Sequence, residues 1–151
     1  RDSSTSRGLG DVYKRQELVT GLLNDGTLAA AQLHGQEDET YIRELKQLSD
    51  KPIIKAFSVK TAEDIEKAVQ SPADYILLDQ GSGGTGKTFD WSLIPEIERP
   101  FFLAGGIGAL NMKQAICEIR PYAVDLSSSV ETEKWKDPKK IRQVVDIVRR
   151  I

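Results

Sequence analysis

The feature of this sequence with the clearest chemical potential is an acid followed by a glycine-rich loop. Asp79 ends the short apolar run at residues 75–78, and four glycines follow between residues 81 and 86. One interpretation is nucleotide binding, because residues 81–88 (GSGGTGKT) fit the Walker A pattern. The other makes Asp79 a catalytic acid at the C-terminal end of a strand, with the glycines in a loop over the substrate. A strand-end aspartate is also often only a turn former or a helix cap.

A nucleotide-binding loop of this kind needs a long helix beginning at its Gly-Lys-Thr, because the helix N-terminus and the loop amides hold the phosphates together. Here Pro95 and Pro100 leave room for only about two helical turns. The context therefore disfavours a P-loop nucleotide binder, which is kept as the less favoured alternative. Lys87 fits a solvated lysine as well as a brace for the glycine loop.

Apolar runs and amphipathic helical patterns alternate along the chain, which predicts a parallel α/β fold. Glycine and proline signals separate the segments. The predicted strands are residues 29–33, 52–57, 75–79, 101–104 and 123–126. The predicted helices are residues 17–23, 37–48, 61–70, 92–97, 111–119 and 138–150.

Polar residues come directly after most of these strands: His34, Ser58, Asp79, Gly105-Gly106 and residues 127–129. In a parallel sheet the carboxyl ends of the strands share one edge, so these groups should converge. Reactive groups spread over successive strand ends are typical of a (βα)8 barrel, whereas a doubly wound sheet concentrates its glycines after the first strand. The pattern favours the barrel.

Glycines and serines after the last two strands are candidates for holding a phosphate. Gly105 and Gly106 would let the backbone approach an anion, and Ser128 and Ser129 would add donors; plain turn chemistry is the alternative. His34 is a candidate substrate contact or a hydrogen-bonded structural residue. Gly83, Gly84 and Asp125 are further candidate contacts, with a bond to a neighbouring loop as the alternative for Asp125.

Composition sets limits on the class of protein. The chain has 151 residues, 39% hydrophobic and 29% charged, with a formal net charge of −2. These values predict a globular cytoplasmic protein with no nucleic-acid partner and no membrane segment. One cysteine and one histidine cannot form an internal disulfide or an ordinary zinc site, so we expect no metal and no cofactor. Cys117 is expected to be a small buried core residue, and residues 131–140 a solvated loop.

Several motifs in order, taken together, resemble the phosphoribosylanthranilate isomerase family of tryptophan biosynthesis. Each motif is weak alone, but their order and spacing over residues 17–151 are specific. They are Gln32-Leu-His-Gly35, Leu77-Leu-Asp79, residues 83–91 (GGTGKTFDW), Leu103-Ala-Gly-Gly-Ile107, Asn111 and residues 120–131 (RPYAVDLSSSVE).

The resemblance implies a (βα)8 barrel, of which residues 17–151 correspond to the last five βα units. The first three units are then missing, and residues 1–16 are a disordered or non-native leader. Five strands cannot close an eight-stranded ring, so the first and last strands are expected to be open edges. We therefore expect self-association through those edges.

The resemblance also implies a reaction. The family converts N-(5-phosphoribosyl)anthranilate to 1-(2-carboxyphenylamino)-1-deoxyribulose 5-phosphate by an Amadori rearrangement. An aspartate, matched by Asp79, protonates the ribose ring oxygen, and a cysteine near the end of the first strand removes a proton from C2. The matching base would lie upstream of residue 17, so the chain as given is expected to be inactive. The alternative is a non-catalytic partial barrel that binds sugar phosphates.

Overall fold

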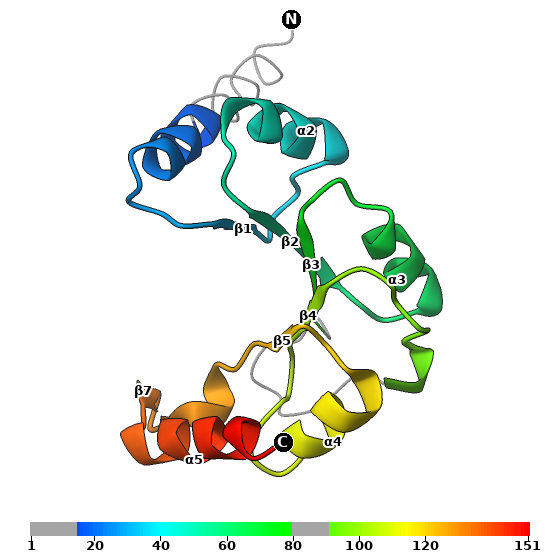
Figure 1. Cartoon of the computed structure of the whole chain (residues 1–151), viewed down its shortest axis with the longest axis vertical. Helices are drawn as coiled ribbons and strands as arrows, with labels where there is room; N and C mark the ends of the chain where they lie inside the picture. Colours follow the sequence, from blue (N-terminus) through cyan, green and yellow to red (C-terminus); the bar gives the residue numbers. More distant parts are fainter. Residues whose placement is uncertain (1–14, 80–90) are drawn as a thin grey trace, which may run out of the picture. The chain divides into compact units, whose positions relative to one another are not determined.

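The computed structural model describes residues 15–79 and 91–151 (Figure 1). Its strands and helices alternate as the apolar runs predicted. The first helix covers residues 15–24. The strands are β1 (Ala31–Leu33), β2 (Ile53–Ser58), β3 (Tyr75–Asp79), β4 (Phe101–Leu103), β5 (Ala123–Val124), β6 (Glu131–Thr132) and β7 (Trp135–Lys136). The other α-helices are α2 (Glu39–Leu48), α3 (Ala62–Val69), α4 (Met112–Gln114) and α5 (Pro138–Arg149).

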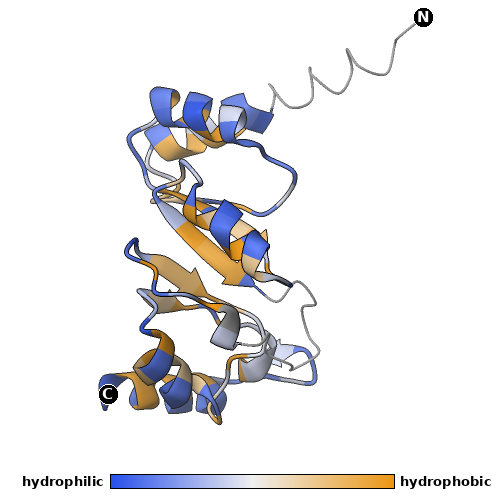
Figure 2. Ribbon diagram, turned by 90° about the vertical axis from the view of Figure 1, so that its right-hand side faces the viewer, coloured by the Kyte–Doolittle hydropathy of each residue, from blue (hydrophilic) through white to orange (hydrophobic). Residues whose placement is uncertain are grey.

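Five of the strands form one sheet in the order β1-β2-β3-β4-β5. The pairs β1·β2, β3·β4 and β4·β5 are parallel, with Ala31 opposite Ile53, Leu77 opposite Phe102 and Leu103 opposite Val124. The expected parallel α/β fold is therefore confirmed. In Figure 2 the strands are largely hydrophobic, while the helices carry both hydrophobic and hydrophilic residues. Buried parallel strands and amphipathic helices that cover them are expected to have these two patterns.

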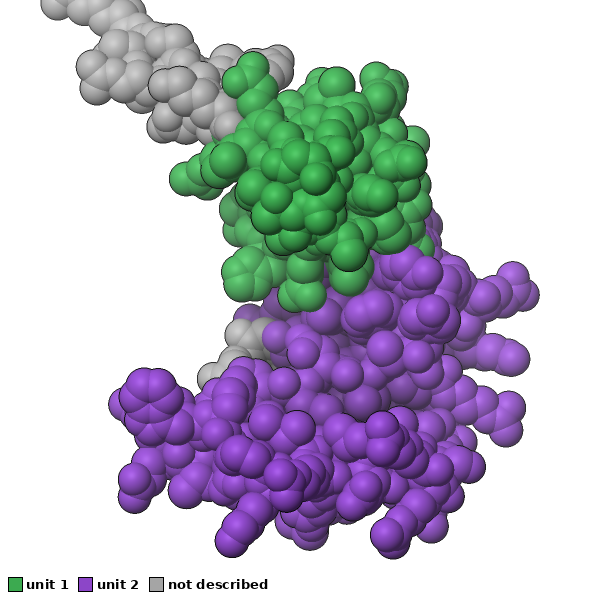
Figure 3. Space-filling model, turned by 60° about the vertical axis from the view of Figure 1, so that its left-hand side comes forward, with its two compact units in different colours: residues 1–55, 72–74 green, residues 56–71, 75–151 purple. Residues whose placement is uncertain are grey.

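The chain divides into two compact units, coloured separately in Figure 3. Unit 1 holds the described residues up to Lys55 together with Pro72–Asp74. Apolar side chains of the first helix and α2 share one hydrophobic cluster with those of β1 and the start of β2. The buried core of the unit is Leu23, Ala31, Leu33, Ile42, Leu45, Ile53 and Ala73.

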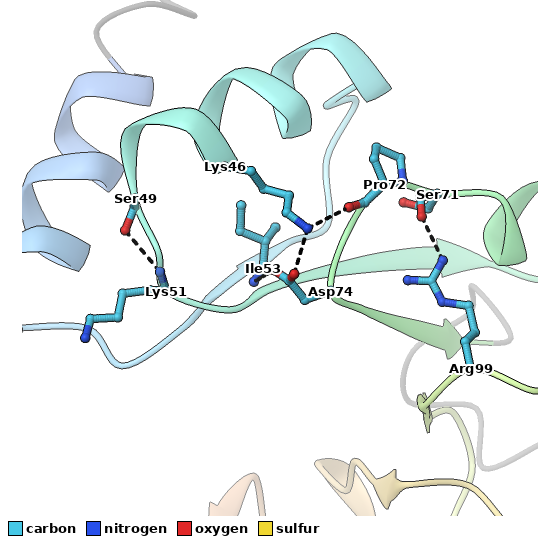
Figure 4. A network of polar contacts seen from close by, with 8 residues as sticks. All are labelled: Lys46, Ser49, Lys51, Ile53, Ser71, Pro72, Asp74 and Arg99. Carbon is cyan, nitrogen blue, oxygen red and sulfur yellow. Dashed lines mark hydrogen bonds and ion pairs between the residues drawn. The ribbon is translucent and has the colours of Figure 1, made fainter.

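Asp74 ties the strand and the helix of unit 1 together (Figure 4). Its carboxylate accepts hydrogen bonds from the Ile53 N–H at 2.8 Å and from Lys46 Nζ at 2.7 Å. Partial burial alone would raise the pKa of Asp74, but these two hydrogen bonds and the lysine charge outweigh it and lower the pKa. Asp74 is thus held as a carboxylate that anchors the N-terminal end of β2.

Unit 2 comprises residues 56–71 and 75–151. Helix α3 begins with a capping box, in which the Thr61 hydroxyl accepts from the Asp64 N–H and the Asp64 carboxylate accepts from the Thr61 N–H. Arg99 donates to the Val69 and Ser71 carbonyls at 2.9 and 2.7 Å, which satisfies acceptors at the C-terminal end of α3. The main buried core of unit 2 comprises Val59, Ile65, Ala68, Ile76, Leu78, Phe101, Leu103, Ile107, Met112, Ala115, Val130 and Val144.

Several elements of the structure differ from those the sequence predicted. The helix expected over residues 92–97 is only the three-residue 3-10 helix Trp91–Leu93, because Pro95 follows at once. Residues 111–119 form α4 followed by the π-helix Ala115–Ile119. The expected solvated loop at residues 131–140 instead contains the antiparallel pair β6·β7. Of the expected leader, residues 15 and 16 already belong to the first helix; residues 1–14 lie outside the described chain.

Candidate functional site

A cavity of about 100 Å3 lies at the carboxyl ends of β3, β4 and β5. Every residue of its lining belongs to unit 2. The lining residues are Asp79, Ala104, Gly105, Gly106, Ile107, Asp125, Ser127, Ser128 and Ser129. The acid at the end of β3 therefore shares one cavity with the glycine pair and the serines that come after β4 and β5 in the sequence.

Asp79 is the last residue of β3 and is partly exposed. Its backbone carbonyl accepts a hydrogen bond from the Val59 N–H, and the carbonyl of Leu78 accepts one from the Ala104 N–H at 2.9 Å. These bonds fix the end of the strand against both neighbouring segments. Asp79 therefore lines the cavity from a strand end whose backbone is hydrogen-bonded on both sides, the placement that an acid or base needs to work on a bound substrate.

The glycine pair forms a turn that only residues without a Cβ adopt easily. Gly105 and Gly106 have φ angles of 88° and 67°. The side chain of Asn111 clasps this turn, since Nδ2 donates to the Gly106 carbonyl at 3.0 Å and Oδ1 accepts from the Gly108 N–H at 2.9 Å. The sequence predicted Asn111 only as a helix cap, whereas its side chain makes no cap bond and holds the turn instead.

The serine segment packs directly against the glycine turn. A Cβ built on Gly108 would lie 3.0 Å from the Ser129 Cβ, closer than side chains normally approach. The Ser129 Oγ is buried and has no hydrogen-bond partner within residues 15–79 and 91–151. A buried hydroxyl without a partner is costly, so this oxygen is suited to donate to a group that enters the cavity.

Of the other residues predicted to contact a substrate, only some line the cavity. Asp125 lies one residue beyond the end of β5, because the strand ends at Val124 rather than at Leu126 as predicted. Its N–H donates to the Leu103 carbonyl at 2.9 Å, and it lines the cavity. His34 is exposed, belongs to unit 1 and is not part of the cavity lining. Gly83, Gly84 and Lys87 lie outside the described residues.

The prediction that Cys117 is buried is wrong: its side chain is exposed. The buried positions nearby are Met112 and Ala115, with Ile116 and Ile119 packed against the core. Cys117 falls between them, on the solvent side of the π-helix. It lines a separate cavity of about 420 Å3 with residues 94–97 and 118–120, which shares no residue with the cavity that contains Asp79.

Neither a metal cluster nor a membrane helix occurs within residues 15–79 and 91–151. No group of three or more His, Cys, Asp or Glu side chains there could hold a metal ion. No helix in these two ranges is both long and apolar enough to cross a bilayer.

The parallel sheet with its helices defines an α/β protein. An acid, a glycine turn and serines line one cavity at the strand ends, an arrangement suited to an anion. The sequence profile of N-(5'-phosphoribosyl)anthranilate (PRA) isomerase matches residues 12–147 of the chain. The chain therefore belongs to the N-(5'-phosphoribosyl)anthranilate isomerase family, as its motifs predicted.

Relatives of known sequence and structure agree with this assignment. The N-(5'-phosphoribosyl)anthranilate isomerase of Endomicrobium trichonymphae is 45% identical over 135 residues, which cover 87% of this chain. The crystal structure of phosphoribosyl anthranilate isomerase from Thermotoga maritima superposes with a TM-score of 0.78 at 35% identity and covers 90% of this chain. A further structure, solved with reduced 1-(o-carboxyphenylamino)-1-deoxyribulose 5-phosphate, is 33% identical over 90% of this chain, with a TM-score of 0.74.

The chain spans only part of these relatives. It covers 66% of the Endomicrobium protein, 69% of the Thermotoga chain and 67% of the chain in the complex.

Proposed function

We propose that this chain provides the acid and the phosphate-binding part of a PRA isomerase active site in tryptophan biosynthesis. The observation that carries the proposal is the cavity in which Asp79 faces the glycine turn and the serine segment. A related isomerase has been solved with a ligand that ends in a 5-phosphate, and backbone amides at glycine-rich turns favour such anions. Gly105, Gly106, Ser128 and Ser129 are the proposed phosphate ligands.

The size of the cavity matches part of the substrate rather than all of it. Pockets that enclose a whole small molecule usually measure about 300–1,000 Å3, whereas this cavity measures about 100 Å3. We propose that it holds the phosphate group and places the ribose beside Asp79. Asp79 then donates its proton to the ribose ring oxygen as the ring opens. His34, Gly83, Gly84 and Asp125 are proposed as further contacts along the rest of the substrate.

We further propose that the five parallel strands are the fourth to eighth strands of a (βα)8 barrel, whose other three units come from a segment not represented here. The sheet order leaves β1 and β5 outermost. Helix α5 also exposes Ile141, Val145 and Val148 by 38%, 39% and 45%. The spacing of these residues places them on one face of the helix, which the remaining units would cover.

Alone, the chain is expected to self-associate through the outermost strands and this face of α5, and sedimentation velocity over a range of concentrations tests this.

The cysteine base that the family resemblance implies has no match among the described residues that line the cavity, and Cys117 lines a different cavity of unit 2. General base catalysis usually contributes about 10²- to 10⁴-fold to a rate. We therefore expect no measurable isomerisation by the chain alone. A non-catalytic barrel part that binds sugar phosphates is the second candidate, favoured by this same separation of Cys117 from Asp79.

The test is complementation. The whole chain is co-expressed with a three-unit N-terminal fragment of a related isomerase in a tryptophan auxotroph, and isomerase activity is assayed in the purified complex. The pair should restore growth, Asp79→Asn should abolish it, and the exposed Asp50→Asn should not. Growth that survives Asp79→Asn would contradict the acid assignment. Failure of the unaltered pair while the chain still binds phosphate would favour the non-catalytic candidate.

Two further expectations have direct measurements. Tight ATP binding that is lost in Lys87→Ala would revive the nucleotide-binding interpretation, although the described chain after residue 90 begins with only the short helix Trp91–Leu93. A cytoplasmic location is proposed from the balanced charge and the biosynthetic family, and cell fractionation tests it.

A further inference from the structure

A hairpin follows the serine segment and returns the chain to it. Strands β6 and β7 pair Glu131 with Lys136 and Thr132 with Trp135. The two turn residues, Glu133 and Lys134, have positive φ angles of 53° and 70°. This tight reversal brings Lys136 back to Ser127, which lines the cavity.

All three N–H donors of the Lys136 ammonium have acceptors in this segment. Nζ lies 3.1 Å from the Ser127 carbonyl oxygen, 3.4 Å from the Ser127 Oγ and 2.6 Å from Glu131 Oε1. A second anchor holds the other end, because the Asp137 N–H donates to the Val130 carbonyl at 2.8 Å and Lys140 Nζ donates to the Glu131 carbonyl at 2.6 Å. The serine segment is thus held at both ends by residues of the hairpin and its flank.

We infer that Lys136 is a positioning residue that holds residues 127–129 in the conformation that binds phosphate. The inference rests on the proposed phosphate site. Ser127 has φ −127° and ψ −84°, outside the helix and strand regions, so its conformation needs support from outside the segment. Amides that already point at the anion bind it without an ordering cost. Since Glu131 neutralises the ammonium, Lys136 acts mainly by fixing the backbone.

The experiment compares Lys136→Gln with Lys134→Gln in the full chain. Both changes remove one positive charge from the same hairpin, but Lys134 makes no hydrogen bond or ion pair with the rest of the described chain. Two quantities are measured by NMR: amide hydrogen exchange of residues 127–130 without ligand, and the Kd for inorganic phosphate from the shifts of Gly105, Gly106, Ser128 and Ser129.

Lys136→Gln should accelerate exchange in this segment and weaken phosphate binding by about 3- to 10-fold, the range expected for the net loss of about one ordinary hydrogen bond. Lys134→Gln should change neither quantity. Lys136→Arg, which keeps charge and donors, should restore most of the affinity. Glu131→Gln, which leaves the bonds between Lys136 and Ser127, should give a smaller effect in the same direction.

Unchanged exchange in Lys136→Gln would overturn the positioning role, and faster exchange with an unchanged Kd would overturn its link to binding. If the unaltered chain shows no phosphate-dependent shifts at these amides, the proposed phosphate site fails and the role of Lys136 in binding fails with it. The exchange data remain separate from that result, so the two failures can be told apart.

Discussion

Replacing Glu37 by glutamine should destabilise unit 1 by about 2 kcal/mol. Lys55 is a lysine in the core of this unit, with a side chain only 7% exposed. Its ammonium donates to the Gly35 carbonyl and to Glu37 Oε2, both at 2.9 Å. The same carboxylate oxygen accepts from the Gly35 N–H at 2.8 Å. Glutamine would leave the buried ammonium without a counter-charge.

The magnitude follows from the burial of the two partners. Removing one member of a fully buried ion pair costs about 3–5 kcal/mol. The Glu37 side chain is 27% exposed, so water partly screens the pair, and the glutamine oxygen can still accept one hydrogen bond. Both effects reduce the cost to about 2 kcal/mol.

The effect should depend on pH with a definite sign. Burial on its own raises the pKa of Glu37, but the hydrogen bond from Lys55, the amide hydrogen bonds and the lysine charge outweigh it and lower the pKa from its ordinary value of 4.5. The carboxylate therefore stabilises the fold fully above pH 4.5, and this contribution is lost as the pH falls through the folded-state pKa. The difference in the stability of unit 1 between the wild type and Glu37→Gln should become smaller over the same pH range.

Native-state hydrogen exchange of the α2 amides measures this difference, because it reports the opening of unit 1 separately from that of unit 2. The matched control is Glu39→Gln, two residues further along the chain in the first turn of α2. Glu39 pairs with Arg43 at 3.2 Å, but both side chains are 63% exposed, so the loss should be at most about 0.5 kcal/mol. The role of Glu37 would be refuted if the two variants lost equal stability at pH 7. It would also be refuted if the stability difference between the wild type and Glu37→Gln did not change with pH.

Three further predictions concern unit 2. Gly108→Ala should weaken phosphate binding several-fold with little loss of helicity, because the new methyl group would push Ser129 out of place; phosphate titration and circular dichroism test this, and an unchanged Kd would contradict it. Thr61→Ala should cost about 1 kcal/mol through loss of the capping box with Asp64; hydrogen exchange in α3 should show it, with Thr61→Ser losing much less. Cys117 should react with a thiol reagent in the folded protein at close to the rate of an unfolded control; strong protection would show that its exposure is wrong.

Features set by neighbouring residues could be predicted from the sequence. The bounds of β3 at Tyr75–Asp79 were predicted correctly, because an apolar run ends there at a carboxylate and a glycine loop. Thr61 and Asp64 form the predicted capping box, and Pro138 starts the last helix as predicted. Each of these signals acts within a few residues, so the sequence is enough to show it.

Features that depend on tertiary contacts could not be predicted. The β6–β7 hairpin is built from short polar strands, and its turn uses Glu133 and Lys134 at positive φ, where glycine or asparagine is the usual signal. The clasp of Asn111 on the glycine turn depends on the fold of that turn. The close approach of Ser129 to Gly108 arises between two loops about 20 residues apart in the sequence. Sequence patterns therefore named most of the cavity lining but not the residues that hold it in shape.

Beyond β3, the cavity is lined by residues 104–107, 125 and 127–129. The hairpin residue that supports them, Lys136, follows soon after in the chain. Segments this close along the chain have a small entropy of loop closure and form contacts early in folding. We expect the proposed phosphate site to form early in folding, before contacts between segments farther apart along the chain. One continuous stretch of coding sequence also specifies it, so recombination between barrel genes could transfer it whole.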